Sequence, residues 1–352
     1  MIKILHSGDW HMDSPVVGLG ASQREQLRRN LLEVPGKLAA LCHRVQADIV
    51  LLTGDLFDGA YTQSGYRAVF DALKEMAVPV FISPGNHDFV SPESPWMREL
   101  WPENVHIFKK NQIESVWIPQ LNCRVYGAGF TEMDCPALLE GFQATEGEVA
   151  LGCFHGDPTL AGSPYNPISR QQVAASGLDY LALGHIHKAD AFRANKTLCA
   201  WSGCPMGTGY DEEGIKGAWV VTVEEEAAAE FVTLNFPRFY DVTVSADSDL
   251  SEVLPAVSND DFYRITFAGE GEKPDLEALK TRYRAFPNLE LRDKTVPPVD
   301  LWTGAGEDSF EGLYFGMLKQ QLEMASEEEK EKILLAAKIS RQILAGEEVA
   351  LP

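Results

Sequence analysis

The sequence predicts an α/β protein with mixed sheets layered between flanking helices, then a small α+β unit and a pair of C-terminal helices. Three observations support this prediction. Apolar runs of strand length alternate with helical periodicity over the first two-thirds of the chain. Strand patterns then follow one another more closely, which is typical of a sheet that becomes mixed. The pattern changes after Phe236-Pro237, so we expect domains at residues 1–236, 237–299 and 300–352.

In residues 1–236 the apolar runs predict strands at 2–6, 48–53, 79–83, 124–127, 148–154, 180–183, 218–223 and 231–235. Helical periodicity covers 23–45 and 64–76. We expect Pro35-Gly36 to break or kink the first helix, because proline cannot donate the intrahelical hydrogen bond. The acidic run EEEAAAE at 224–230 is expected to form a solvated hairpin between two strands.

The rest of the chain alternates short strands and helices. Strands are expected at 241–245, 262–267 and 289–292, and helices at 250–257 and 275–286. The stretch TVPPVD at 295–300 is typical of a stiff linker. Two amphipathic helices follow at 310–324 and 327–344; Ser326 and Glu329 form a capping-box pattern, and Gly346 suits the end of the second helix.

Composition narrows the class of protein. Apolar residues make up 45% of the chain and charged residues 23%, which is ordinary for a globular protein. No run approaches the roughly 18 apolar residues of a membrane span, and the chain opens directly on a strand pattern without an export signal. The six cysteines form no CxxC pair, so we expect reduced thiols and a cytoplasmic location. The net charge of −22 disfavours a free-standing nucleic-acid binder with a broad cationic surface, so a phosphate-bearing substrate must be attracted locally.

Five polar motifs each follow a predicted strand: GDWH at 8–11, GDLFD at 54–58, GNHD at 85–88, His155, and GHIH at 184–187. Each alone is more often a turn with a hydrogen-bonded histidine than a site. As an ordered set they predict one site, because the ends of parallel strands lie along one edge of a sheet. In the last motif, His185 and His187 stand two apart and therefore face the same side of an extended chain.

The residue types fit a pair of divalent ions about 3.5–4 Å apart, which require imidazole and oxygen ligands and a bridging carboxylate. We assign Asp9, His11 and His187 to one ion, and Asn86, His155 and His185 to the other, with Asp55 as the bridge. Such a pair lowers the pKa of a water molecule and supplies hydroxide for in-line attack on phosphorus.

The motif order D-x-H, GD, GNH[DE], H, GHxH resembles the calcineurin-like metallophosphoesterase superfamily over residues 1–236. The stretches DWHMDSP at 9–15, LDYLALGHIHK at 178–188 and SGCPMGTGYDEEGIKGAWVVTV at 202–223 resemble the SbcD/YhaO branch of bacterial DNA-repair exonucleases. The resemblance implies a layered sandwich with a capping domain. It also implies the same seven metal ligands, with manganese the usual metal and iron, zinc or nickel as alternatives.

The resemblance further implies that His87 is the catalytic histidine, which stabilises the phosphoryl charge or protonates the leaving oxygen. Asp58 stands where some relatives carry a second histidine and is a second catalytic candidate. A DNA exonuclease or endonuclease is therefore expected. The alternatives are a phosphoesterase of nucleotides or other small esters, and a non-catalytic scaffold. The C-terminal helices imply docking on an SMC-like ATPase of the SbcC type; packing on the cap or a homodimer are the alternatives.

Overall fold

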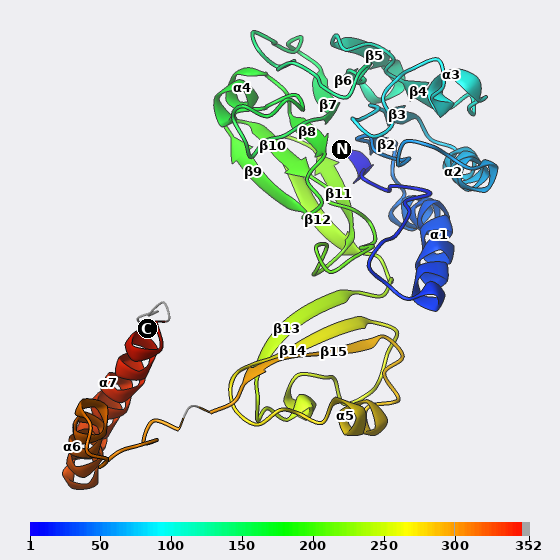
Figure 1. Ribbon diagram of the computed structural model, residues 1–352. Helices are drawn as coiled ribbons and strands as arrows, with labels where there is room; N and C mark the ends of the chain where they lie inside the picture. The colour runs from blue at the N-terminus through cyan, green and yellow to red at the C-terminus, as the bar shows by residue number, and fades with distance from the viewer. Residues whose placement is uncertain (299, 347–352) are drawn as a thin grey trace. The chain divides into compact units, whose positions relative to one another are not determined.

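The computed structural model describes residues 1–298 and 300–346, and the chain divides into two compact units (Figure 1). The first unit comprises Met1–Asp241 together with Asn259–Arg264. The second comprises Val242–Ser258 and the chain from Ile265 onward. Residues 347–352 of the predicted helical segment, and Val299 of the predicted linker, lie outside the described residues.

Two six-stranded sheets make up most of the first unit (Figure 1). The first contains, in spatial order, β12 (Ala227–Thr233), β11 (Gly217–Val223), β1 (Ile2–Ser7), β2 (Ile49–Leu52), β3 (Val80–Ile82) and β4 (Val105–Ile107). The second contains β5 (Glu114–Ile118), β6 (Cys123–Gly127), β7 (Val149–His155), β8 (Tyr180–Gly184), β10 (Thr197–Trp201) and β9 (Asp190–Ala194). Strands β1 to β4 are parallel, as are β6, β7, β8 and β10, while antiparallel strands complete both sheets. The predicted mixed α/β architecture is confirmed.

Successive side chains of a strand point to opposite faces of its sheet and join different layers of the first unit. In β2, Ile49 and Leu51 share a buried core with Leu151 of the second sheet, so the two sheets pack face to face. The intervening Val50 and Leu52 join the core under helices α1 (Ala21–Val45) and α2 (Gln63–Met76). The outer face of the second sheet packs near α4 (Arg170–Ala175), and a short α3 (Pro95–Arg98) follows β3. The layers therefore run helix, sheet, sheet, helix.

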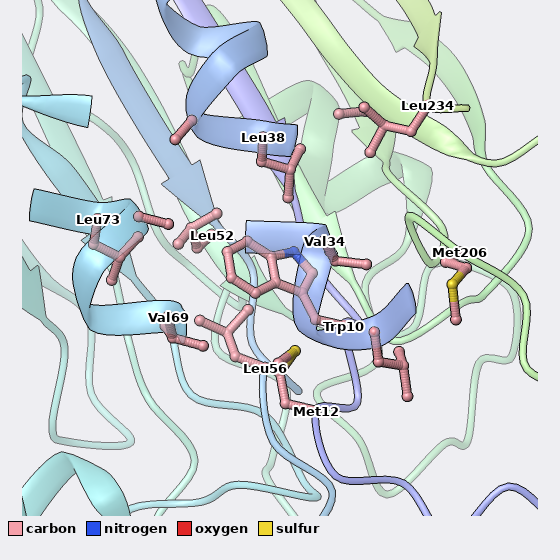
Figure 2. Packing of buried hydrophobic residues seen from close by; sticks show 14 of the residues in the cluster. Trp10, Met12, Val34, Leu38, Leu52, Leu56, Val69, Leu73, Met206 and Leu234 are labelled. Atoms are coloured by element: carbon pink, nitrogen blue, oxygen red, sulfur yellow. The ribbon is translucent and has the colours of Figure 1, made fainter. Parts of the chain in front are cut away.

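Trp10 occupies the helix-side core rather than the surface (Figure 2). Its ring lies among Val34, Leu38, Leu52 and Leu56, and it is 1% exposed. The indole Nε1 donates to Ser7 Oγ at 2.9 Å, so the polar edge of the ring is also satisfied. Because Trp10 is fixed in this core, the backbone next to it, which carries Asp9 and His11, is also held in place.

Of the two effects predicted for Pro35-Gly36, a break or a kink, the break does not occur, because α1 continues through both residues to Val45. Pro35 is buried beside Val34 and Leu38. The lost backbone hydrogen bond is offset by burial of this apolar face, since tertiary packing commonly outweighs local propensity. The chain leaves α1 at Gln46, which adopts a left-handed conformation.

Several strand boundaries also differ from the prediction. Strand β12 begins at Ala227, so the alanines of the EEEAAAE run pair with β11 and only Glu224–Glu226 form the turn. Strands β4, β5, β9 and β10 were not predicted. They are three to five residues long and three of them are half exposed, so they lack a continuous apolar run.

A three-stranded sheet is formed by β13 (Phe239–Ser245), β14 (Phe262–Glu270) and β15 (Leu289–Val296), with α5 (Leu276–Arg282) between the last two strands. The helix predicted at 250–257 is only a single 3₁₀ turn, Leu250–Glu252. Strand β15 reaches Val296, so Thr295 and Val296 belong to the sheet rather than to a linker. Helices α6 (Phe310–Met324) and α7 (Glu327–Ala345) follow, close to their predicted bounds.

Replacing Gly36 by alanine should stabilise the protein by about 0.5–1 kcal/mol, because glycine is costly inside a helix. A Cβ at this position would meet nothing within 4 Å. Thermal and urea unfolding measure the change. Gly54→Ala is the contrasting variant: its φ is +87° and a Cβ would lie 2.5 Å from the Ser83 carbonyl oxygen, so it should destabilise. A destabilised Gly36→Ala protein would contradict this account of α1.

Candidate metal centre

The structure brings all seven predicted ligands to one edge of the paired sheets. Parallel strands β1, β2 and β3 lead into the loops that carry Asp9, Asp55 and Asn86. From the second sheet, β7 ends in His155, and β8 leads into His185 and His187. Each sheet therefore contributes part of the cluster.

Distances divide the cluster into two groups. In the first, His11 Nε2 lies 3.0 Å from His187 Nε2, and Asp9 offers a carboxylate oxygen within 4.8 Å of both rings. In the second, Asn86 Oδ1 lies 2.9 Å from His155 Nε2 and 3.2 Å from His185 Nδ1.

Asp55 lies between the two groups. Its Oδ2 is 3.9 Å from His11 Nε2 in the first group and 3.5 Å from His155 Nε2 in the second. Asp9 also offers a carboxylate oxygen within 4.8 Å of Asp55 and His155, so the assignment of these ligands to two ions stays a prediction.

The backbone is strained where it presents these side chains. Positive φ angles occur at Asp9 (52°), His11 (46°), Asp55 (48°) and His185 (93°). Non-glycine residues rarely adopt this conformation, which costs on the order of 1–3 kcal/mol each. Strain concentrated at four ligand candidates is typical of a functional site.

Two glycines provide the space for the cluster. A Cβ at Gly85 would lie 2.3 Å from Asp55 Oδ1 and 2.7 Å from the His155 ring. A Cβ at Gly184 would lie 2.3 Å from the Thr53 carbonyl oxygen. Any larger residue at either position would displace a ligand or separate the two sheets.

Hydrogen bonds on the far side of two imidazoles determine which nitrogen faces the cluster. His155 Nδ1 donates to the Thr53 carbonyl at 2.8 Å, and His187 Nδ1 contacts Glu212 Oε1 at 2.5 Å. In both residues Nε2 is therefore directed inward, as is usual for metal-ligating histidines. Glu212 was not recognised in the sequence, where it lies among other acidic residues with no distinguishing spacing.

Asp88 connects two of the ligand-bearing loops. Its carboxylate accepts hydrogen bonds from the backbone N–H groups of Asp55, Leu56, Phe57 and Gly85, at 2.8–3.3 Å. The sequence presented Asp88 only as the last letter of GNHD. Its role depends on contacts with a loop some thirty residues earlier.

Three carboxylates are buried at or beside the cluster. Asp9, Asp55 and Asp88 are 0%, 2% and 3% exposed, and none forms an ion pair with lysine or arginine among the described residues. Burial raises the pKa of Asp9 despite the nearby imidazoles, and burial with the adjacent Asp55 raises the pKa of Asp88 to about 7. Buried carboxylates without cationic partners are unfavourable unless a cation compensates them. The donor set and its charge therefore fit divalent metal ions.

His87 and Asp58 lie at the margin of the cluster. His87 Nδ1 is 2.7 Å from Asp58 Oδ1, and the His87 side chain is 45% exposed. The hydrogen bond to Asp58 raises the pKa of His87 above its ordinary value despite partial burial. Both residues line a cavity of about 190 Å³ together with Asp9, His11 and His187.

Comparison with known proteins identifies the family. The family model "Calcineurin-like phosphoesterase" matches residues 2–189, more than half of the chain. The chain belongs to this family. The seven clustered residues and His87 all lie within the matched region.

Relatives support the SbcD/YhaO branch of the family. The metallophosphoesterase YhaO of Bacillus subtilis is 31% identical over 260 residues, which cover 68% of this chain and 61% of that protein. The SbcD polypeptide of the nuclease SbcCD from the same organism is 26% identical over 297 residues, covering 72% of this chain and 74% of that protein. Among solved structures, TT1561 of Thermus thermophilus has a TM-score of 0.42 at 15% identity, covering 65% of this chain and 98% of that one. The chain thus spans less than two-thirds of the length of YhaO.

Other histidines are separate from the site. His6 is fully buried between the sheets, where Nδ1 contacts Tyr180 Oη at 2.7 Å and Nε2 contacts the Leu183 carbonyl. Burial lowers the pKa of His6 to about 3, so it stays neutral. His6 is therefore part of the core between the sheets. No described helix is both long and apolar enough to cross a bilayer.

Asp55→Ala should abolish binding of both ions, because Asp55 stands between the two groups and each would lose an oxygen ligand. Metal content after manganese loading and dialysis, measured by mass spectrometry, tests this. Asp71→Ala removes an exposed carboxylate from α2 and should retain full metal content. An Asp55→Ala protein that still held two ions per chain would contradict the bridging position.

Proposed function

We propose that this protein is a two-metal phosphodiesterase that hydrolyses DNA, with manganese as its metal. The observation that carries the proposal is the seven-residue cluster in two groups around Asp55, with His87 and Asp58 beside it. Asp9, His11 and His187 would hold one ion and Asn86, His155 and His185 the other. When bound, such an ion pair lowers the pKa of a water molecule and neutralises phosphate charge.

The protein's own groups would then complete the chemistry. His87, whose Nδ1–H donates to Asp58, presents its other nitrogen without a partner in the described structure. Because Asp58 favours the imidazolium form, His87 can stabilise the phosphoryl oxygens or transfer its Nε2 proton to the leaving oxygen. Asp58 retains the Nδ1 proton and keeps the ring oriented.

Support for DNA as the substrate comes from the relatives and from the space around His87. The chain resembles a polypeptide named as part of a nuclease. His87 also lines a second cavity of about 480 Å³, together with Tyr61, Phe89 and Arg98. A phosphodiester carries groups on both sides of phosphorus, and the two cavities would accommodate one on each side.

A second candidate is hydrolysis of nucleotides or other small phosphate esters. The net charge of −22 favours it, because such a surface repels the phosphate backbone of DNA. A non-catalytic scaffold is disfavoured, since the predicted ligands are all present and the His87–Asp58 pair lies beside them at the edge of the cluster. Turnover on linear DNA, cyclic nucleotides and phosphomonoesters, compared under identical manganese concentrations, separates these functions.

We further propose that the protein acts in the cytoplasm with an SMC-like ATPase that supplies part of the DNA affinity. Helices α6 and α7 contact each other through Tyr314 and Ser340, yet Leu313, Met317 and Ile343 remain 59–63% exposed. Exposed apolar side chains on paired helices require a covering surface. A second copy of the chain is the alternative occupant.

His87→Ala should lower kcat on an aryl phosphodiester by about 10²–10⁴-fold, because the proton donor is lost while the ligands remain. Two manganese ions per chain should still bind. His43→Ala, at an exposed position on α1, serves as the control and should behave as wild type. Wild-type activity that resists a chelator, or a His87→Ala protein with full turnover, would contradict the proposed chemistry.

A chain ending at Pro298 should fold, retain manganese-dependent phosphodiesterase activity and lose association with the ATPase. The reason is that removal of α6 and α7 leaves the two sheets and the cluster intact. Circular dichroism, turnover and co-purification with the ATPase test this. Aggregation of the shortened chain would instead show that the helices cover its core. Tight DNA binding by the full-length protein alone at physiological salt would argue against the partner.

A further inference from the structure

His187 is held by a segment that belongs to none of the five motifs. Glu212 lies between β10 and β11, and its Oε1 contacts His187 Nδ1 at 2.5 Å. A carboxylate oxygen accepts, so Nδ1 carries a proton and Nε2 is the nitrogen that faces the ligand cluster. That Nε2 lies 3.0 Å from His11 Nε2, inside the first group of ligands.

The Glu212 carboxylate is itself anchored. Its second oxygen, Oε2, accepts from the Thr208 backbone N–H at 2.7 Å and from Thr208 Oγ1 at 2.9 Å. The Glu212 N–H donates to the Gly209 carbonyl at 3.1 Å, which closes a compact turn. A Cβ at Gly207 would lie 2.8 Å from the Glu212 carbonyl oxygen, so the turn also depends on a glycine there. Glu212 therefore offers a fixed acceptor rather than a mobile side chain.

The main chain of His187 is held by the same segment. Lys216 Nζ donates to the His187 carbonyl at 3.0 Å, and the Cys204 N–H donates to the same oxygen at 3.3 Å. Lys216 is only 6% exposed, which is rare for lysine and requires a specific partner. Residues 204–216 thus hold both the ring and the backbone of His187.

We propose that Glu212 is the positioning residue for His187, setting its tautomer and ring orientation so that Nε2 faces the metal centre, an inference that rests on the proposed metal function. Oε1 contacts the nitrogen opposite the cluster, so Glu212 acts through His187 and not as a ligand. Its loss should weaken the ion held by Asp9, His11 and His187 far more than the ion held by the other group.

The test uses full-length protein and manganese binding measured by calorimetry and by electron paramagnetic resonance of the bound ions. Glu212→Ala should weaken one of two sites by about 10–100-fold and reduce the signal of the coupled pair. Glu212→Gln keeps an acceptor oxygen and should restore most of the affinity, which a metal-ligating carboxylate would not allow. Thermal unfolding of the metal-free variants checks that both are folded.

Glu213→Ala is the matched control, because it removes the neighbouring exposed carboxylate, which does not touch His187. Equal weakening by Glu213→Ala, or unchanged binding in Glu212→Ala, overturns the inference. If Glu212→Ala does not fold, Glu212→Asp is measured instead. Its shorter side chain cannot reach His187 and Thr208 together, so it must weaken manganese binding at the same site. Wild-type protein that binds fewer than two ions would instead overturn the proposed function.

Discussion

The arrangement of the site depends on the hydrogen bonds accepted by the Asp88 carboxylate. Four backbone N–H groups, from Gly85 and from Asp55 to Phe57, converge on it in a place removed from water. Such charge-assisted bonds are strong where the dielectric is low. They hold the loops after β2 and β3 at one separation, and the positions of Asp55 and Asn86 follow from that separation.

Two other carboxylates, those of Asp9 and Asp55, also accept hydrogen bonds from the backbone of another loop of the site. The Asp9 carboxylate accepts from the His185 backbone N–H at 2.9 Å, and Asp55 Oδ1 accepts from the His87 N–H at 2.9 Å. Each carboxylate that faces the cluster therefore also fixes the loop of another ligand. Substitution of one carboxylate is expected to disturb neighbours as well, which explains why effects in such networks do not add.

The local charge at the cluster explains how an acidic protein can attract a phosphate-bearing substrate. The chain carries a net charge of −22, yet its buried carboxylates, imidazoles and amide converge where a few cationic charges can be concentrated. A local field of this kind attracts phosphate over a short range only, because salt screens charges beyond about 8–10 Å. This limit gives physical grounds for a partner that contributes DNA contacts, as proposed for the C-terminal helices.

The sequence by itself determined the fold class and the residues that meet, because parallel strands must deliver their carboxyl ends to one edge and polar residues follow those ends in order. The metal-binding and catalytic roles of those residues remain predictions. Only the tertiary structure decided the continuity of α1 through Pro35, the strand character of Ala227–Glu230, and the contacts of Asp88, Glu212 and Lys216. In each case the cause is a partner distant in sequence: a buried face, a paired strand or a hydrogen bond across a loop. The local sequence does not identify these partners, because the stabilising contacts form only when segments distant in sequence pack together.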